Sequence, residues 1–386
     1  MHPLKIIVIG AGIGGLTSAI ACRRAGYDVE VYDRIEKLRP SGGGITLWPN
    51  GVKALEMLGF GDKIASLSGC MNYIEYRSRE DEFLSRVNLE SFVDRVGQRP
   101  YPLSRWDLQQ MLLKDVGIDN IHLGMKCIAV EQNSHSVTAI FEDGTRTTGN
   151  LLIGADGIHS QIRSHVTEQD VLLRYAGYVN WNGLIPAWGK LHTLDKWIIY
   201  VGDNKRVSIM PIGNGQISYV FGAPMPKGTV VASKERKFEL ENIFADWHKV
   251  SHLIQNLEHQ KINRIEINDI HPLKKLVRGR VALLGDAGHP STPALGQGAC
   301  QAMEDAIVLI RYLIESKVNV ENALKHYENK RKGRTTALLL QARKRTNMFY
   351  GKNSELTKKW YLHLKERKEA EVVDYMAKIF FGSPFD

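Results

Sequence analysis

The stretch that decides the fold is KIIVIGAGIGGLTSAIACRRAGYDVEVYD, residues 5–33. It begins with an apolar strand at residues 5–10, passes through a glycine turn into a helix of small residues at 15–26, and ends with a second strand at 28–33. This order of strand, helix and strand, with glycines before the helix, predicts the opening of a doubly wound, nucleotide-binding α/β sheet.

The glycines of this turn are Gly10, Gly12, Gly14 and Gly15. In the pattern G-x-G-x-x-G the first glycine allows a tight turn, the second lets a pyrophosphate approach the backbone, and the third lets the helix pack on the strand. The helix N-terminus offers free N–H groups to phosphates. Asp33, followed by Arg34, ends the second strand and is placed to accept a hydrogen bond from a ribose hydroxyl. The motif predicts dinucleotide binding without distinguishing FAD from NAD.

A second glycine-rich segment, LGDAGHPSTPALGQG at residues 284–298, favours FAD. Its carboxylate, Asp286, ends a buried strand at the sheet edge where ligands bind, and a ribityl chain would supply hydroxyls for it. The helix that begins near Gly298 points its N-terminus at the same place, where it would stabilise the negative charge of a reduced flavin. His289 has two interpretations, a catalytic base or a residue that holds the loop by hydrogen bonding, and we favour the second.

Strand-rich segments interrupt the mixed helix and strand pattern twice. We interpret residues 1–72, 100–170 and 270–350 as one discontinuous FAD-binding domain. Residues 73–99 and 171–269 read as an inserted antiparallel sheet that binds the substrate, and residues 351–386 as a helical tail. The predicted fold class is therefore α/β, a discontinuous doubly wound sheet with an inserted antiparallel sheet and a helical C-terminus.

The formal net charge of +9 comes mostly from basic runs late in the chain. Apolar residues at helical spacing accompany these runs, so the basic residues are expected on the wet faces of C-terminal helices. No nucleic-acid motif accompanies the charge, and we expect no nucleic-acid partner. The four cysteines lack metal-ligand spacing, and the chain shows no secretory signal and no apolar run long enough to span a bilayer. We predict a cytoplasmic protein without a metal site.

Three motifs, in this order, resemble those of the flavoprotein aromatic hydroxylases, single-component FAD monooxygenases with the fold of p-hydroxybenzoate hydroxylase. Besides the two glycine-rich segments, Asp156-Gly157 with Ser160 and Arg163 is similar to the D-G-x-x-S-x-x-R motif of that family. The resemblance implies FAD as cofactor and NADH or NADPH as co-substrate. It implies FAD contacts at Gly10, Gly12, Gly14, Gly15, Asp33, Arg34, Arg105, Asp156, Gly285, Asp286, Pro293, Gly296, Gln297, Gly298 and Ala299.

Within that family, segments such as YAGYVNWNGL (175–184) and GQGAC (296–300) are most similar to the FAD-dependent urate hydroxylases. Arg206 matches their catalytic arginine on a central strand of the substrate sheet. The chain departs from them at two places: Ala294 stands where they have an acid, and Ser218 where they have a tyrosine. Tyr219 lies one residue further along, which points it to the opposite sheet face unless a bulge intervenes. Arg206 and Tyr219 are our candidate catalytic residues.

The hypothesis is a monooxygenase in which O₂ and reduced FAD form a C4a-hydroperoxide that hydroxylates a small planar aromatic or heteroaromatic ring, with a urate-like ring favoured. Arg206 would hold the anionic ring. Four aromatic residues are candidates for a pocket wall or for ordinary core: Trp181, Tyr200, Tyr219 and Phe221. Three alternatives stay open: a salicylate-type or other ring hydroxylase, a flavin reductase or dehydrogenase without oxygen transfer, and a non-enzymatic dinucleotide-binding protein. A monomer and a homodimer are equally compatible with the sequence.

Overall fold

The opening unit forms β1 (Lys5–Ile9), α1 (Ile13–Arg24) and β2 (Asp28–Asp33), as the glycine pattern predicts. In this computed structural model, which describes residues 4–40, 42–189, 195–317, 319–351 and 354–385, β1 and β2 pair in parallel. They belong to a six-stranded sheet of order β17-β18-β11-β1-β2-β7, in which β1 is a central strand and β2 lies next to the edge strand β7. Its other strands are β7 (Ile121–Leu123), β11 (Leu151–Gly154), β17 (Val277–Arg278) and β18 (Val281–Leu283).

Both faces of the six-stranded sheet are covered. Successive side chains of β1 point to opposite faces, and the side chains on each face pack in a separate core. Ile6 and Val8 pack in a core with the helices α1, α5 (Arg105–Val116) and α9 (Gly298–Glu315). Ile7 and Ile9 pack in another core with a three-stranded antiparallel sheet. That sheet consists of β8 (Cys127–Gln132), β9 (Val137–Phe141) and β10 (Arg146–Gly149).

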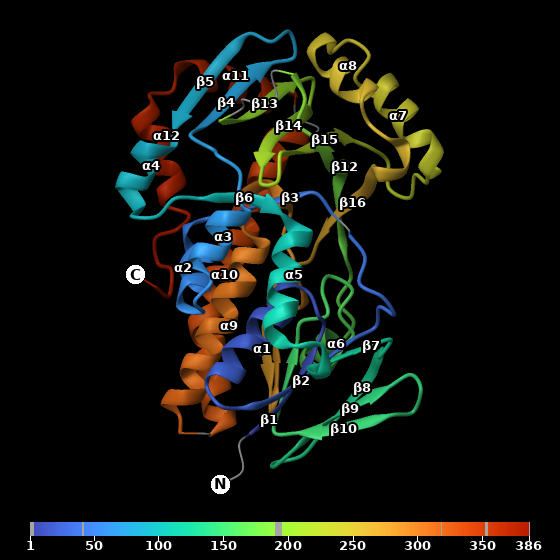
Figure 1. Cartoon of the computed structure of the whole chain (residues 1–386), viewed down its shortest axis with the longest axis vertical. Helices are drawn as coiled ribbons and strands as arrows, with labels where there is room; N and C mark the ends of the chain where they lie inside the picture. Colours follow the sequence, from blue (N-terminus) through green and yellow to red (C-terminus); the bar gives the residue numbers. More distant parts are fainter. Residues whose placement is uncertain (1–3, 41, 190–194, 318, 352–353, 386) are drawn as a thin grey trace.

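A seven-stranded sheet lies beyond one end of the six-stranded sheet, at the top of Figure 1. Its order is β16-β12-β15-β14-β13-β4-β5, and all neighbours are antiparallel except β13 and β4. Its strands are β4 (Tyr73–Ser78), β5 (Phe83–Asn88), β12 (Arg174–Pro186), β13 (Lys196–Gly202), β14 (Lys205–Ile212), β15 (Gln216–Pro224) and β16 (Asn263–Asp269). Between the two large sheets lie β3 (Gly44–Leu47) and β6 (Tyr101–Ser104), which pair with each other, and the helices α2 (Pro49–Met57) and α3 (Gly61–Leu67).

Both predicted strand-rich segments, residues 73–99 and 171–269, also contain helices that the sequence analysis missed. α7 (Arg236–Ile243) and α8 (His248–Gln255) cover one face of the seven-stranded sheet, where Leu240 and Trp247 join its core. α4 (Leu89–Val96) follows β5 directly. Each of these helices has only eight residues, so too few apolar positions repeat to reveal the helical period.

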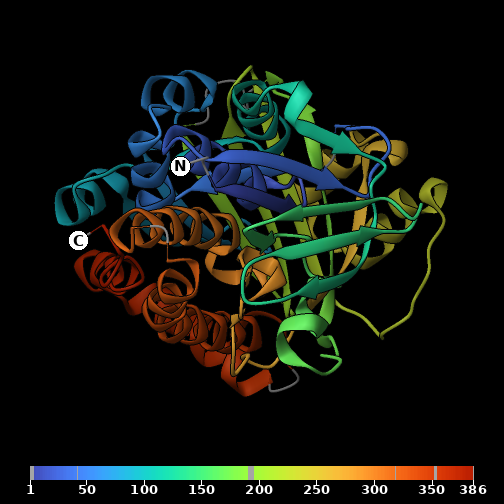
Figure 2. The same ribbon diagram turned by 90° about the horizontal axis from the view of Figure 1, so that it is seen from below.

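The helical C-terminus is confirmed. α9 and α10 (Val320–Tyr350) are followed by α11 (Ser354–Glu366) and α12 (Glu369–Ala377), and a short α6 (Ile162–Thr167) lies earlier in the chain. Seen from below, the orange and red helices of residues 298–377 lie together on one side of the molecule (Figure 2). α10, with 31 residues, is long enough to contact β17 of one sheet and β12 and β14 of the other. Among the described residues, no helix is long and apolar enough to cross a membrane.

Candidate active site

The glycines between β1 and α1 play distinct structural roles. Gly10 has a φ of +111°, and a β-carbon there would collide with the carbonyl group of Ala155. A β-carbon on Gly15 would collide with the carbonyl oxygen of Gly10, which explains the close packing of helix on strand. A β-carbon on Gly12, in contrast, would meet no atom within 4 Å. Gly12 therefore presents bare backbone to open space at the N-terminus of α1.

A cavity of about 310 Å³ lies beside this turn. Asp33 borders it and accepts hydrogen bonds from the backbone N–H groups of Ala11, at 2.6 Å, and Ile35, at 3.0 Å. The predicted residues that the structure brings together around this cavity are Gly10, Gly12, Asp33, Arg34, Arg105 and Asp156. Residues from four separated parts of the chain thus surround one space at the carboxyl ends of β1, β2 and β11, where doubly wound sheets bind ligands.

Asp156 points one carboxylate oxygen into its own loop and leaves the other unsatisfied. Oδ2 accepts hydrogen bonds from the N–H groups of Gln161, at 2.8 Å, and Ile162, at 3.3 Å. Oδ1 is buried and has no hydrogen-bond partner among the described residues. Burial raises the pKa of this carboxyl group, and the hydrogen bonds oppose that effect. An unpartnered acceptor at a cavity wall is a place for a ligand donor.

Arg163 links this loop to the second glycine-rich segment. Its buried guanidinium donates hydrogen bonds to the carbonyl oxygens of Ile158 and Gly157 on one side, at 2.8 and 3.3 Å. On the other side it donates to the carbonyl oxygens of Asp286 and Ala287, both at 2.8 Å. The arginine of the D-G-x-x-S-x-x-R motif therefore holds two binding loops in a fixed relation.

Asp286 and Arg105 lie close enough for their charges to interact. The Asp286 side chain is accessible to solvent, although protein surrounds it closely enough that desolvation raises the pKa of its carboxyl group. Burial lowers the pKa of Arg105, and the charge of Asp286 opposes that shift. No hydrogen bond between described residues involves the Arg105 guanidinium. Arg105 also lines the cavity beside the first glycine turn, so its charge lies between that cavity and Asp286 of the second glycine-rich segment.

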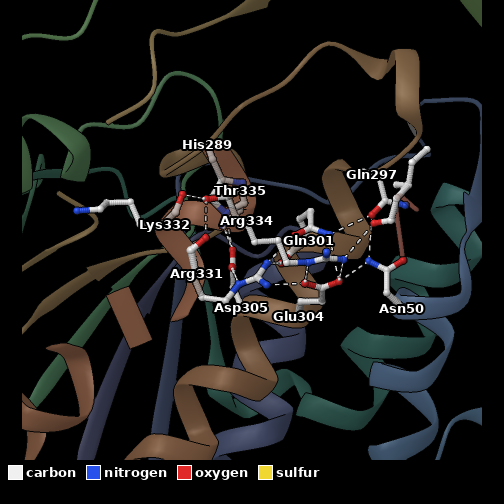
Figure 3. Close-up of polar contacts among 12 residues, drawn as sticks. Asn50, His289, Gln297, Gln301, Glu304, Asp305, Arg331, Lys332, Arg334 and Thr335 are labelled. Atoms are coloured by element: carbon white, nitrogen blue, oxygen red, sulfur yellow. Dashed lines mark hydrogen bonds and ion pairs between the residues drawn. The ribbon is translucent and has the colours of Figure 1, made fainter. Parts of the chain in front are cut away.

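A buried network of charged and amide side chains is hydrogen-bonded to the second glycine-rich segment, residues 284–298 (Figure 3). Asp305 on α9 accepts hydrogen bonds from the N–H of Gly285, at 2.9 Å, and from His289, at 2.6 Å. It also accepts one from Arg331 on α10, at 2.6 Å. Although desolvation raises the pKa of Asp305, the charges of His289 and Arg331 lower it to about 2. His289 thus contacts Asp305 and holds the loop, in agreement with the interpretation we favoured.

The network continues along α9 to the start of α2. Glu304, fully buried, pairs with both Arg331 and Arg334 and accepts a hydrogen bond from Asn50 at 2.6 Å. The expectation that the late basic residues lie on wet helix faces is therefore wrong for Arg331, which is 0% exposed. Its carboxylate partners lie 26 and 27 residues earlier, so the local pattern around residue 331 does not reveal them.

Arg206 lies on the face of the seven-stranded sheet that we call the inner face, which carries Arg206, Ser208 and Met210 of β14. Its guanidinium carbon lies 5.1 Å from the ring centroid of Phe349 and 5.9 Å from that of Trp197. Its Nε is buried and has no hydrogen-bond partner among the described residues. An arginine held by aromatic rings, with a buried donor unpaired, is ready to bind an acceptor.

Tyr219, the second catalytic candidate, is not brought together with Arg206. It pairs with Ile209 on the outer face, packs in the core beneath α7 and α8, and is 1% exposed. Strand β15 keeps regular register with β14 past this residue, so no bulge turns the side chain back. The three other aromatic candidates, Trp181, Tyr200 and Phe221, pack in the same core. We therefore correct the assignment of Tyr219, and the four aromatic residues form ordinary core.

The two residues that depart from the urate-hydroxylase pattern, Ser218 and Ala294, lie on the side of the seven-stranded sheet that carries Arg206. Ser218 accepts a hydrogen bond from the N–H of Gly44 at 2.8 Å, and a β-carbon on Gly44 would lie 2.6 Å from that of Ser218. Gly44 therefore lies close against the position where the urate-hydroxylase pattern has a tyrosine. Ala294 packs against the aromatic cluster that contains Phe349 and Tyr350.

The sequence analysis missed the residues of α10 that complete the site. Phe349 contacts Arg206, and Tyr350 lies near it, so that the charge of Arg206 opposes the rise that burial causes in the pKa of Tyr350. Their only sequence signal was a pair of aromatic residues at the end of a basic helix.

Known proteins resemble the chain over nearly its whole length. A family model described as FAD binding domain matches residues 3–342. The FAD-dependent urate hydroxylase of Klebsiella pneumoniae subsp. pneumoniae is 42% identical, over 99% of this chain and 100% of that protein. The 3-amino-4-hydroxybenzoate 2-monooxygenase of Streptomyces cremeus is 33% identical, over 90% of this chain and 88% of that protein. The crystal structure of Klebsiella pneumoniae HpxO complexed with FAD and uric acid has a TM-score of 0.96 and 41% identity, covering 99% of this chain and 98% of that chain.

Proposed function

This chain belongs to the FAD binding domain family, among the FAD-dependent hydroxylases, and from that premise we propose that it hydroxylates a small planar ring of the urate type. The family and fold class predicted from the sequence are confirmed, and so is FAD as the cofactor. The urate hydroxylase of Klebsiella supports a urate-like ring, and the hydroxybenzoate monooxygenase supports the wider class of aromatic substrates.

The residues of this chain fit FAD. The bare backbone of Gly12 at the N-terminus of α1 suits a pyrophosphate, and Asp33 borders the same cavity. Two buried donors have no hydrogen-bond partner among the described residues: Nε1 of Trp48, which lies against Gly296, and Nε2 of Gln297, the next residue in the chain. A polar edge of the flavin ring would accept hydrogen bonds from both. We assign the pyrophosphate to residues 10–15 and the ribityl chain and flavin ring to the segment 285–299, with Arg105 and Asp286 beside them.

When bound, FAD would supply the redox chemistry, in which NADH or NADPH is the hydride donor and one oxygen atom of O₂ is transferred to the substrate ring. The protein contributes position and charge. The N-terminus of α9, with the N–H groups of Gly298 and Ala299, would stabilise negative charge on the reduced ring. Arg163 and Asp305 keep the two loops that bind the cofactor in place.

The buried Nε of Arg206, which has no hydrogen-bond partner among the described residues, carries the proposal for the substrate. A planar fork of N–H donors on the inner face can pair with the oxygen and nitrogen acceptors of an anionic ring. Ala294, in the segment that we assign to the flavin, lies in the same cluster as the aromatic side chains near Arg206, which supports neighbouring sites for substrate and cofactor.

A screen of ring substrates tests this function. We expect the purified protein to be yellow and to oxidise NADH or NADPH faster when urate or a related ring is added, with one ¹⁸O atom from O₂ in the product. Hydroxylation of salicylate but not of urate would favour the salicylate-type alternative. Stimulated oxidation of the nicotinamide without ¹⁸O in any product would point to a reductase. A colourless protein that takes up no FAD would refute the proposal.

Two glycine variants test the assignment of the pyrophosphate. Gly15→Ala is expected to give misfolded protein, because its β-carbon would overlap a backbone carbonyl. Gly12→Ala meets no atom and is expected to keep a normal thermal midpoint while losing at least roughly tenfold in FAD affinity, because the methyl group occupies the space that the backbone leaves for phosphate. Flavin fluorescence titration of the apoprotein measures the affinity. Unchanged FAD affinity in Gly12→Ala would contradict the assignment.

The remaining predictions from the sequence extend the proposal. We propose residues 73–99 and 171–269 as the substrate domain, supported by the seven-stranded sheet that takes strands from both ranges. The cytoplasm remains our proposed compartment, supported by four cysteines that are all free thiols.

A further inference from the structure

Two asparagines of β12 share the inner face with Arg206. Asn180 and Asn182 flank Trp181, which packs in the outer core, so strand alternation places both amides on the inner side. Across the sheet, Asn180 lies opposite Gly222 of β15, and Gly222 lies opposite Arg206 of β14. On this row, Gly222 lies between Asn180 and Arg206, and the hydroxyl group of Tyr350 lies over that glycine.

Asn180 and Arg206 each keep a buried polar atom unpaired. Asn180 is 7% exposed, and its Oδ1, like the Nε of Arg206, has no hydrogen-bond partner among the described residues. The hydroxyl group of Tyr350 occupies the space above Gly222, since a β-carbon on this glycine would collide with that hydroxyl and would lie 3.0 Å from Asn180 Oδ1. A buried acceptor and a buried donor that stay unpaired destabilise the fold. A ligand that pairs with both would take the place of the Tyr350 hydroxyl group above Gly222.

Asn182 lies on the next row and borders an open space. It stands opposite Val220, and both are partly exposed although they lie on central strands, whereas Ser208, the next residue along that row, is buried. A β-carbon on Gly43, in the loop before β3, would lie 3.6 Å from Asn182 Oδ1. Asn182 therefore lies beside this glycine loop at a partly exposed part of the inner face, and its amide makes no hydrogen bond to the described residues.

Resting on the proposed function, we propose that Asn180 and Asn182 are specificity-determining residues that recognise a lactam edge, adjacent C=O and N–H groups, on the ring that Arg206 binds. A carboxamide offers N–H donors and a carbonyl acceptor, the complement of a lactam, whichever way the amide is turned. Arg206 has donors only, so it can hold an anionic ring but cannot select N–H groups. The two amides supply the acceptors for ring N–H groups that this chain lacks at Ala294, where the urate-hydroxylase pattern has an acid.

The test compares two planar anions, urate, which carries lactam edges, and salicylate, which has no ring N–H. Binding to the FAD-loaded enzyme is followed by the change in the flavin absorption spectrum. Asn182→Leu keeps the size of the side chain and removes its hydrogen bonds. We expect it to weaken urate binding about 10- to 100-fold, because the partners of a designed hydrogen bond are left unpaired, and to leave salicylate binding unchanged or improved. Asn180→Leu is expected to act in the same direction.

Asn256→Ala is the matched control. Asn256 is an exposed asparagine at the end of α8, beyond the outer face, and its side chain donates a hydrogen bond to the carbonyl of His252. The urate affinity of the Asn256→Ala variant should equal that of the wild type. Thermal unfolding of each FAD-loaded variant identifies any that fail to fold, and Asn182, being partly exposed, provides the variant least prone to misfolding.

Three results would overturn the inference: urate binding in Asn182→Leu as tight as in the wild type, an equal loss for urate and salicylate, or a wild type that binds salicylate and not urate. In the last case hydroxylation of salicylate would leave the proposed ring hydroxylase standing. If the wild type hydroxylated no ring at all, the proposed function itself would fail.

Discussion

Replacing Arg206 by glutamine is expected to lower ring hydroxylation by about 100-fold while the protein still purifies with FAD. Glutamine keeps a polar side chain of similar length but loses the charge and the planar fork that would pair with an anionic ring. Arg206 lies on the seven-stranded sheet and belongs to neither glycine-rich segment, so cofactor binding should not change. Single-turnover measurements of product, together with substrate titration by flavin absorption, separate the loss in binding from the loss in rate.

Two companion variants sharpen this result. Arg206→Lys keeps the charge without the fork and should fall between the wild type and Arg206→Gln. Tyr219→Phe removes a hydroxyl group from the outer core and should leave the rate unchanged, because Tyr219 lies on the opposite sheet face. If Arg206→Gln hydroxylated its best substrate as fast as the wild type, Arg206 would have no part in the reaction.

Replacing Arg331 by methionine is expected to destabilise the fold by about 3–5 kcal/mol. Methionine fills much of the same volume but leaves Glu304 and Asp305 as buried carboxylates without this partner. Asp305 also anchors the N–H of Gly285, so the segment that we assign to the flavin should loosen and FAD affinity should fall as well. Denaturant unfolding followed by circular dichroism gives the stability, and flavin fluorescence gives the affinity.

Arg311→Met provides the control on a neighbouring helix. Arg311 also pairs with a glutamate on α9, Glu315, but its side chain is 62% exposed. Such an exposed pair contributes roughly 0.3–0.5 kcal/mol, so the variant should differ little from the wild type. A loss in Arg331→Met no larger than the loss in Arg311→Met would show that the buried network does not stabilise the fold.

Local sequence was sufficient for the parts of the site that depend on short-range geometry. The φ of +111° at Gly10 and the close contact at Gly15 are properties of a tight turn between a strand and a helix, and the spacing of the glycines revealed them. The helix that begins at Gly298 was visible for the same reason. The eight-residue helices α4, α7 and α8 were missed because so short a segment shows little periodicity.

Strand alternation made part of the arrangement on the seven-stranded sheet predictable from the sequence. It predicted that Tyr219 would point away from Ser218 unless a bulge intervened, and the regular register of β14 and β15 then placed it in the outer core. It did not predict that Gly44 would approach Ser218 so closely, because that contact joins residues 174 positions apart.

By itself, then, the sequence determined the nucleotide-binding unit, the family and the cofactor, since these follow from glycines, carboxylates and helix starts at fixed local spacing. Only the tertiary structure decided which residues surround Arg206, which face Asn180 and Asn182 share with it, and why Arg331 is buried. Those relations depend on strand register and on where α10 crosses both sheets. They join residues far apart in the chain, and a pattern within a short window carries no information about such contacts.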